Sequence, residues 1–294
     1  MAITASMVKE LRTATGAGMM DCKKALSETD GDMDAAVEFL RKKGMAGADK
    51  KAGRVAAEGI IAIAVSDDKK SAIIAEVNCE TDFVAKGDEF KNFANEIAAQ
   101  ALAADTTDAE TIMGLTMANG KTVDETRREM IARIGENMAL RFAQKVESNG
   151  TIGMYQHGEK IGVAVAIDGG DEALARDIAM HIAAANPAAI SADDVDQEML
   201  AKERAFQIEQ AKESGKPMEI IEKMIEGRMR KYLSDITLVG QAFVKDPDTT
   251  IEKLLKANGA TVTAFNRLEV GAGIEIEETN FADEVALAAK SVTG

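Results

Sequence analysis

The sequence predicts an α+β protein whose core contains the same supersecondary unit twice. Residues 59–104 and 150–185 each have two short β-rich runs joined by a polar turn, followed by an alanine-rich helix. The two helices carry Ala, Ile and Ala at the same offsets, so we expect two related subdomains. Residues 194–233 differ, because they have the pattern of an antiparallel hairpin of two long amphipathic helices.

Length and charge narrow the classes of function. A chain of 294 residues can bury two or three packed units. Its formal net charge of −15 argues against a nucleic-acid partner, because phosphate backbones are bound by clustered Lys and Arg. Residues 1–54 alone carry nearly as many acidic as basic side chains, which sets this stretch apart from the acidic remainder.

The two cysteines, Cys22 and Cys79, lie far apart and outside any C-x-x-C pattern. We expect them to be reduced, buried thiols of a cytoplasmic protein. The first residues lack the charged start and apolar region of a signal peptide, and no run approaches the ~20 apolar residues of a membrane span. A cytoplasmic location without membrane contact is therefore expected.

Residues 3–43 predict three short helices. Thr4 is the expected N-cap of the first, and Asp32 that of the third, since short side-chain oxygens satisfy the free N–H groups of a first turn. The inner positions of the third helix are expected to be Ala36, Val37 and Leu40. Residues 50–54 then form a basic linker to the core.

Met19 and Met20 open the second of these helices. Consecutive residues point about 100° apart on a helix, so one side chain can pack inward while the other faces out. An exposed Met would offer a polarizable contact to an apolar groove of a partner. Packing in the core is the alternative for either residue.

Residues 76–86 follow an apolar, β-branched run that is typical of a strand. After the strand, Thr81 or Asp82 can cap a helix that continues through residue 97. Phe83 then lies at the helix entry. From spacing alone, we expect Phe83 to pack beneath its own helix as a hydrophobic staple. A contact with another molecule is the alternative.

Residues 123–142 predict one helix, which carries Ile-Gly-Glu-Asn at positions 134–137. The loop before it imitates a phosphate-binding P-loop, but five residues separate Gly114 from Gly120 where that loop needs four. No buried strand precedes it either. We therefore expect an ordinary loop and no nucleotide site.

The segment 214–217 has a glycine, which is typical of a helix end, followed by a proline, which is typical of a helix start. It marks the tip of the hairpin at 194–233. This hairpin could self-associate, brace the core or contact a partner, and the sequence leaves the three alternatives open. The elements expected after it are strands at 236–239 and 264–270, a helix at 249–258 between them, and a short final helix at 281–290.

The only histidines are His157 and His181, so the sequence offers no His-rich metal set and no Ser-His-Asp triad. His181 falls on the alanine-rich face of a helix, where packing is expected. His157 falls in a hairpin turn, where simple exposure and contact with a partner are the alternatives. We expect no enzyme activity, no cofactor and no metal ion.

Residues 76–86 and 11–26 resemble the two signature segments of the elongation factor Ts family. Shorter matches occur at 155–158, 214–217 and 267–271, so the resemblance covers essentially the whole chain in order. It implies that the N-terminal three-helix module is ubiquitin-associated-like. The expected divisions are this module at 1–54, core subdomains at 55–145 and 146–270, the second with the hairpin 194–233 inserted, and a C-terminal module at 271–294.

The resemblance also implies a function. The partner would be elongation factor Tu bound to GDP, and the protein would promote GDP release by disturbing the partner's magnesium and phosphate site, so that GTP rebinds. In the family, a Thr-Asp-Phe-Val element enters the partner's nucleotide-binding domain. That element corresponds here to Thr81, Asp82, Phe83 and Val84. Further candidate contacts are Met19, Met20 and His157. A homodimer or a two-by-two complex with the partner is an alternative to a monomer.

Overall fold

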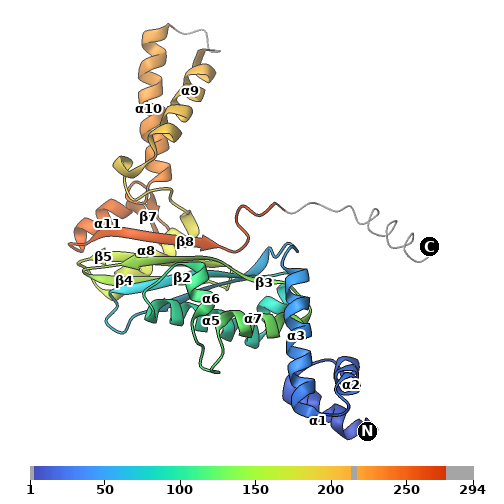
Figure 1. Ribbon diagram of the computed structural model, residues 1–294. Coiled ribbons are helices and arrows are strands. Elements are labelled where there is room, and N and C mark those ends of the chain that lie inside the picture. Colours follow the sequence, from blue (N-terminus) through green and yellow to red (C-terminus); the bar gives the residue numbers. More distant parts are fainter. Residues whose placement is uncertain (1–2, 213–216, 276–294) are drawn as a thin grey trace.

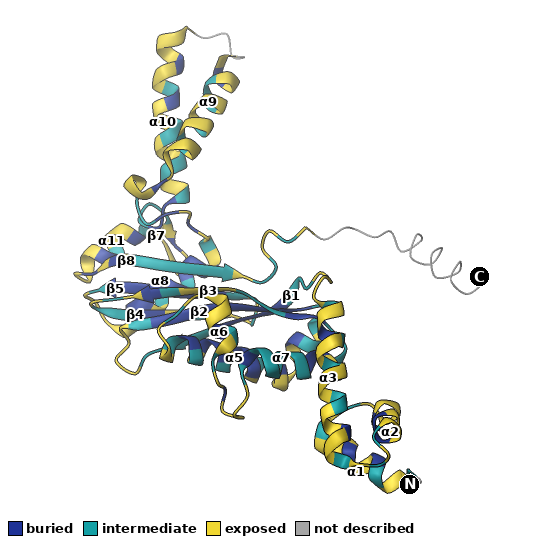
Figure 2. Cartoon of the chain, viewed as in Figure 1, coloured by how far each residue is buried: buried dark blue, intermediate teal, exposed yellow. Residues whose placement is uncertain are grey.

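The computed structural model describes residues 3–212 and 217–275. Its core has four layers, in which two three-stranded antiparallel sheets pack face to face and helices cover the outer face of each (Figure 1). Burial is concentrated in the sheets and in the helix faces that touch them (Figure 2). The predicted α+β class is confirmed. Over the described ranges, no helix combines the length and the apolar character needed to cross a membrane.

Three helices form the N-terminal unit, namely α1 (Ala5–Thr15), α2 (Met19–Glu28) and α3 (Met33–Lys51). Thr4 and Asp32 each accept an N–H group three residues ahead, so both predicted N-caps are confirmed. The buried residues between the helices are Val8, Leu11, Cys22, Ala25, Leu26 and Ala36. Leu40 packs against them as expected, but Val37 is exposed, because it lies about 100° around the helix from buried Ala36.

Helix α3 joins this unit to the core. It runs through Lys51, so the linker predicted at 50–54 is wrong for its first two residues. Its second half packs on helix α7 (Val123–Ile134), and Ala48 is buried there among core residues. This contact stabilises the extra helical turns. The N-terminal unit is therefore held by a continuous helix rather than by a flexible tether.

The first sheet has the order β1-β2-β3, with β1 (Glu58–Val65), β2 (Ser71–Cys79) and β3 (Met138–Glu147). The helices on its outer face are α5 (Asp88–Ala103), α6 (Ala109–Gly114) and α7. The central strand β2 is buried on both faces, since Ile73 and Val77 point to the helices and Ala72 points to the second sheet. Its hairpin with β1 is confirmed.

The prediction of one helix over 123–142 is wrong beyond Ile134. Gly135 takes a left-handed conformation with φ +95°, and its N–H closes the helix on the carbonyl of Ile131. Residues 138–147 then pair with β2 as strand β3. They become a strand because the open edge of β2 satisfies their backbone N–H and C=O groups.

The second sheet has the order β4-β5-β8, with β4 (Thr151–His157), β5 (Ile161–Asp168) and β8 (Thr261–Glu269), and helix α8 (Glu172–Ala185) packs on its outer face. This confirms the second hairpin-and-helix unit and the strand predicted at 264–270. The two sheets approach closely at Gly162, where a Cβ atom would lie 2.5 Å from Cγ2 of Ile61. Only glycine fits there without movement of the opposing sheet.

Helices α9 (Gln197–Lys212) and α10 (Met218–Ile236) form the predicted hairpin, which projects from the core (Figure 1). Because Ile236 is the last residue of α10, the strand predicted at 236–239 is wrong. Thr237 makes a single parallel bridge with Ala189 instead. The remaining elements are a short 3-10 helix (Ala192–Asp194), β6 (Ala242–Phe243), β7 (Asp246–Thr250) and α11 (Ile251–Ala257). The helix predicted at 281–290 lies outside the described residues.

His181 is a packing residue of α8, as expected, and is completely buried. Its Nδ1 accepts the N–H of Val244 at 3.3 Å, so its Nε2 carries the proton and donates to Oε1 of Gln241 at 3.0 Å. Burial lowers the pKa of His181, because the charged ring would lose its hydration. Both ring nitrogens are therefore used in holding α8 to the β6–β7 region.

Candidate functional site

The candidate site begins where β2 leaves the core. Cys79 is the last residue of the strand and is buried, Glu80 is partly exposed, and the five-residue helix α4 (Asp82–Lys86) follows. Thr81 caps this helix, because its hydroxyl oxygen accepts the N–H of Val84 at 3.4 Å. A strand with both faces buried thus delivers a short, capped turn to the surface.

The turn is separated from the next helix. Gly87 is extended, with φ −70° and ψ 135°, and it ends α4 and precedes α5. The prediction of one helix through residue 97 is therefore wrong. Within the short helix α4, Val84 and Ala85 pack on the core that α5 covers, whereas Phe83 lies on the outer side. Phe83 is 84% exposed, so the staple interpretation is wrong as well.

The four residues of the predicted element have different surroundings. Thr81 is the cap, and Val84 packs against the first core, the apolar cluster between the sheet β1-β2-β3 and its helices. Asp82 forms an ion pair with Lys86, whose Nζ lies 2.6 Å from its carboxylate. That hydrogen bond lowers the pKa of Asp82 and raises the pKa of Lys86, so both stay charged at neutral pH. Thr81 and Asp82 are thus held by polar contacts and Val84 by packing, whereas the Phe83 ring is 84% exposed and belongs to no buried cluster of the described residues.

Two carboxylates fasten the turn to the segment after α7. Glu136 accepts the Thr81 N–H at 3.0 Å with one oxygen and the Thr81 hydroxyl at 2.7 Å with the other. In the opposite direction, Glu80 accepts the N–H of Asn137 at 2.6 Å. We call these reciprocal bonds of residues 80–81 and 136–137 the clasp. They fix the backbone on which Phe83 is carried.

The thiol of Cys79 adds a further contact, because Sγ lies 3.2 Å from the carbonyl oxygen of Thr81. Burial raises the pKa of this thiol to about 12, so it is protonated and donates to the carbonyl. Both cysteines are free and buried, as expected. A neutral, buried thiol is a poor nucleophile, so Cys79 serves packing and hydrogen bonding rather than redox chemistry.

The other candidate residues lie elsewhere. Met19 and Met20 are 59% and 73% exposed at the start of α2, so the core alternative is wrong for both. His157 is exposed at the end of β4. The turn after it is tied to the first sheet, because Ile61 donates its N–H to the Glu159 carbonyl at 2.8 Å. An ion pair of Glu159 with Lys91 links the same turn to α5, the helix that follows α4.

Sequence reasoning missed Glu136 and Asn137 as parts of the site, because it placed both inside a helix. The signal that could have found them is Gly135, since glycine is the usual residue just after a helix end. A helix that stops there releases the next residues into a turn. Those residues are then free to reach the end of β2.

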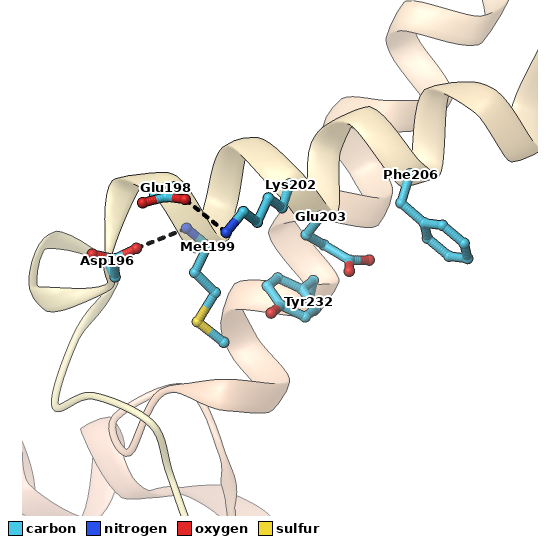
Figure 3. Close-up of a pocket in the computed structure, with 7 residues that line it drawn as sticks. All are labelled: Asp196, Glu198, Met199, Lys202, Glu203, Phe206 and Tyr232. Atoms are coloured by element: carbon cyan, nitrogen blue, oxygen red, sulfur yellow. Dashed lines mark hydrogen bonds and ion pairs between the residues drawn. The ribbon is translucent and has the colours of Figure 1, made fainter.

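The helical hairpin carries a second surface feature, a shallow pocket between α9 and α10 (Figure 3). Met199 and Phe206 are exposed on α9, and Tyr232 of α10 faces the same side. Of the charged groups around them, Lys202 and Glu198 form an ion pair, and Asp196 accepts the N–H of Met199 at 2.8 Å. Among the residues that the structure describes, no group of three or more His, Cys, Asp or Glu side chains gathers as a metal site.

An exposed aromatic ring on a firmly held turn fits a protein that binds another protein, because aromatic side chains are frequent anchors of interfaces. The family model described as Elongation factor TS matches residues 80–272. The chain belongs to the elongation factor Ts family, and it is a translation elongation factor of the guanine nucleotide exchange class.

Individual relatives agree with this assignment. The protein named Elongation factor Ts from Hydrogenovibrio crunogenus is 77% identical over 100% of both chains. Those of the same name from Methylococcus capsulatus and Thioalkalivibrio sulfidiphilus are 58% and 56% identical. They cover 97% and 99% of this chain and 98% and 99% of their own lengths.

The exposure of Phe83 generates a prediction about stability. Phe83→Ala should change the free energy of unfolding by no more than about 0.5 kcal/mol, because an exposed ring contributes little packing. The matched control is Phe90→Ala in the first core, which should cost about 3–5 kcal/mol. Denaturant unfolding of both variants measures the difference. A large loss for Phe83→Ala would mean that the ring packs against the protein after all.

Proposed function

We propose that the protein binds elongation factor Tu in its GDP form and speeds GDP release by disturbing the partner's magnesium and phosphate site, so that GTP rebinds. The observation that supports this most directly is Phe83, a ring exposed at the tip of a turn whose backbone is fixed by the clasp. An exposed aromatic side chain gains most when a partner pocket removes it from water. Phe83 is therefore the proposed wedge.

The proposed action is on the site that holds the nucleotide. The sequence has no P-loop with the required spacing, so capture of the nucleotide by the protein itself is not part of the mechanism. In the partner, Mg²⁺ and the phosphates stabilise each other electrostatically. Entry of Thr81, Asp82, Phe83 and Val84 would loosen that coordination. The nucleotide would then dissociate faster without any contact to its base.

A second contact is proposed at the N-terminal module, residues 1–54. Met19 and Met20 form an exposed apolar pair on α2, and flexible Met side chains adapt to apolar grooves. His157 is proposed as a third contact, since its turn is linked to α5. The same proposal includes core subdomains at 55–145 and 146–270 and a C-terminal module at 271–294. It also includes a cytoplasmic location, no enzyme activity, and either a homodimer or a two-by-two complex with the partner as the alternative to a monomer.

The wedge hypothesis predicts a specific loss of activity. Phe83→Ala should reduce the acceleration of GDP release from elongation factor Tu by about 30-fold or more, because a buried interface anchor is worth about 2 to 4 kcal/mol. The measurement is the release rate of labelled GDP at saturating concentrations of the variant. The control is Phe142→Ala, which removes an exposed ring of β3 and should leave the rate unchanged. Full activity of Phe83→Ala rules the wedge out.

The second contact predicts a different kinetic signature. The double variant Met19→Ala/Met20→Ala should bind elongation factor Tu about tenfold more weakly, a change of about 1.4 kcal/mol, because two apolar side chains no longer leave water. The maximal GDP release rate at saturation should not change, since the wedge is intact. Met45→Ala in α3 is the control for loss of an exposed Met. Unchanged affinity of the double variant contradicts the second contact.

A further inference from the structure

We propose that Glu136 is the positioning residue of the exchange element, and that it acts on the partner only through the direction it gives to Phe83. This inference rests on the proposed function of Phe83. Its basis is the pair of hydrogen bonds by which one carboxylate receives both the N–H and the hydroxyl of Thr81, at 3.0 Å and 2.7 Å. Hydrogen bonds to an ionised carboxylate are stronger than those between neutral groups.

The length of α4 makes this support necessary. The helix has only five residues, and isolated helices shorter than about 12 residues are marginal in water. Its first turn depends on Thr81, whose hydroxyl oxygen receives the Val84 N–H while its hydrogen goes to Glu136. Without the carboxylate, the hydroxyl is free to rotate and the cap is weakened. Phe83 lies within that first turn, so its direction depends on Glu136.

The clasp holds the turn from both of its segments. Glu80 accepts the Asn137 N–H, so the two segments are held by bonds that run both ways. Asn137 is buried, and its side-chain amide donates to the carbonyl of Arg54 at 2.9 Å. Glu136 and Asn137, two residues that follow α7, thus hold the wedge turn and the chain that enters β1. A partner would meet a preorganised surface and would not bear the entropy cost of ordering it.

The first experiment uses the free, full-length protein, and it measures hydrogen–deuterium exchange of backbone amides. In Glu136→Ala, the amides of Thr81, Val84 and Ala85 should exchange at least tenfold faster than in the unmodified protein, while those of β2 and α5 keep their rates. Glu136→Gln keeps one acceptor oxygen and should fall between the two. Glu129→Ala removes a partly exposed, ion-paired carboxylate of α7 and is the control. Unchanged protection of residues 81–85 in Glu136→Ala overturns the proposal.

The second experiment asks whether Glu136 works through Phe83. GDP release from elongation factor Tu is measured for Glu136→Ala, Phe83→Ala and the double variant. Glu136→Ala alone should lower the maximal release rate about tenfold, with Glu136→Gln losing less and Glu129→Ala losing nothing. In the Phe83→Ala background, Glu136→Ala should cause no further loss. If the two losses multiply instead, Glu136 contacts the partner or the fold independently, and the positioning role is wrong.

Failure of this inference is distinguishable from failure of the proposed function. If Phe83→Ala retains full activity, the wedge is wrong, and the exchange protection of residues 81–85 still decides whether Glu136 orders the turn. If Phe83→Ala is inactive but Glu136→Ala is fully active, the wedge hypothesis is supported and the positioning role of Glu136 is wrong. Loss in both single variants with no added loss in the double variant supports both.

Discussion

The burial of β2 on both faces is the constraint on which the rest of the structure depends. Alternate side chains of this strand enter two different cores, one beneath the helices and one between the sheets. A strand held on both sides and paired along both edges cannot shift its register without exposing apolar side chains. Its last residue, Cys79, therefore has a fixed place. The position of the turn that follows is fixed in the same way, because it is attached directly to the end of this strand.

Polar groups buried beside β2 show how firmly the strand is held. Glu76 is almost completely buried, and its carboxylate receives Arg141 at 3.2 Å and the N–H of Gly271 at 2.8 Å. A buried carboxylate without such partners would be costly, so these contacts tie β3 and the chain after β8 to the central strand. The clasp repeats the principle at the surface with Glu80 and Glu136. The Phe83 ring lies outside this network and is exposed to water.

The sequence predicted those parts of the fold that depend on local pattern. Caps, turns and alanine-rich helices follow from residue types, and the N-caps Thr4 and Asp32 and both hairpin-and-helix units are found where expected. Strand β3 could not be predicted, because residues 138–147 contain many helix formers and owe their strand state to the open edge of β2. The outward direction of Phe83 was likewise hidden, since a Phe at a helix entry often packs inward as a staple, whereas here Val84 and Ala85 occupy the core side of α4. Family resemblance, rather than spacing, singled out that residue.

The most direct test of the account is a calorimetric titration of the protein into elongation factor Tu at different levels of GDP and Mg²⁺. Exchange by distortion of the metal site requires reciprocity, because a factor that weakens nucleotide binding must itself be weakened to the same extent by the nucleotide. We expect tight association with the nucleotide-free partner and a progressive loss of affinity as GDP and Mg²⁺ rise together, with GTP acting in the same direction. An affinity that is indifferent to nucleotide and Mg²⁺ would contradict the account.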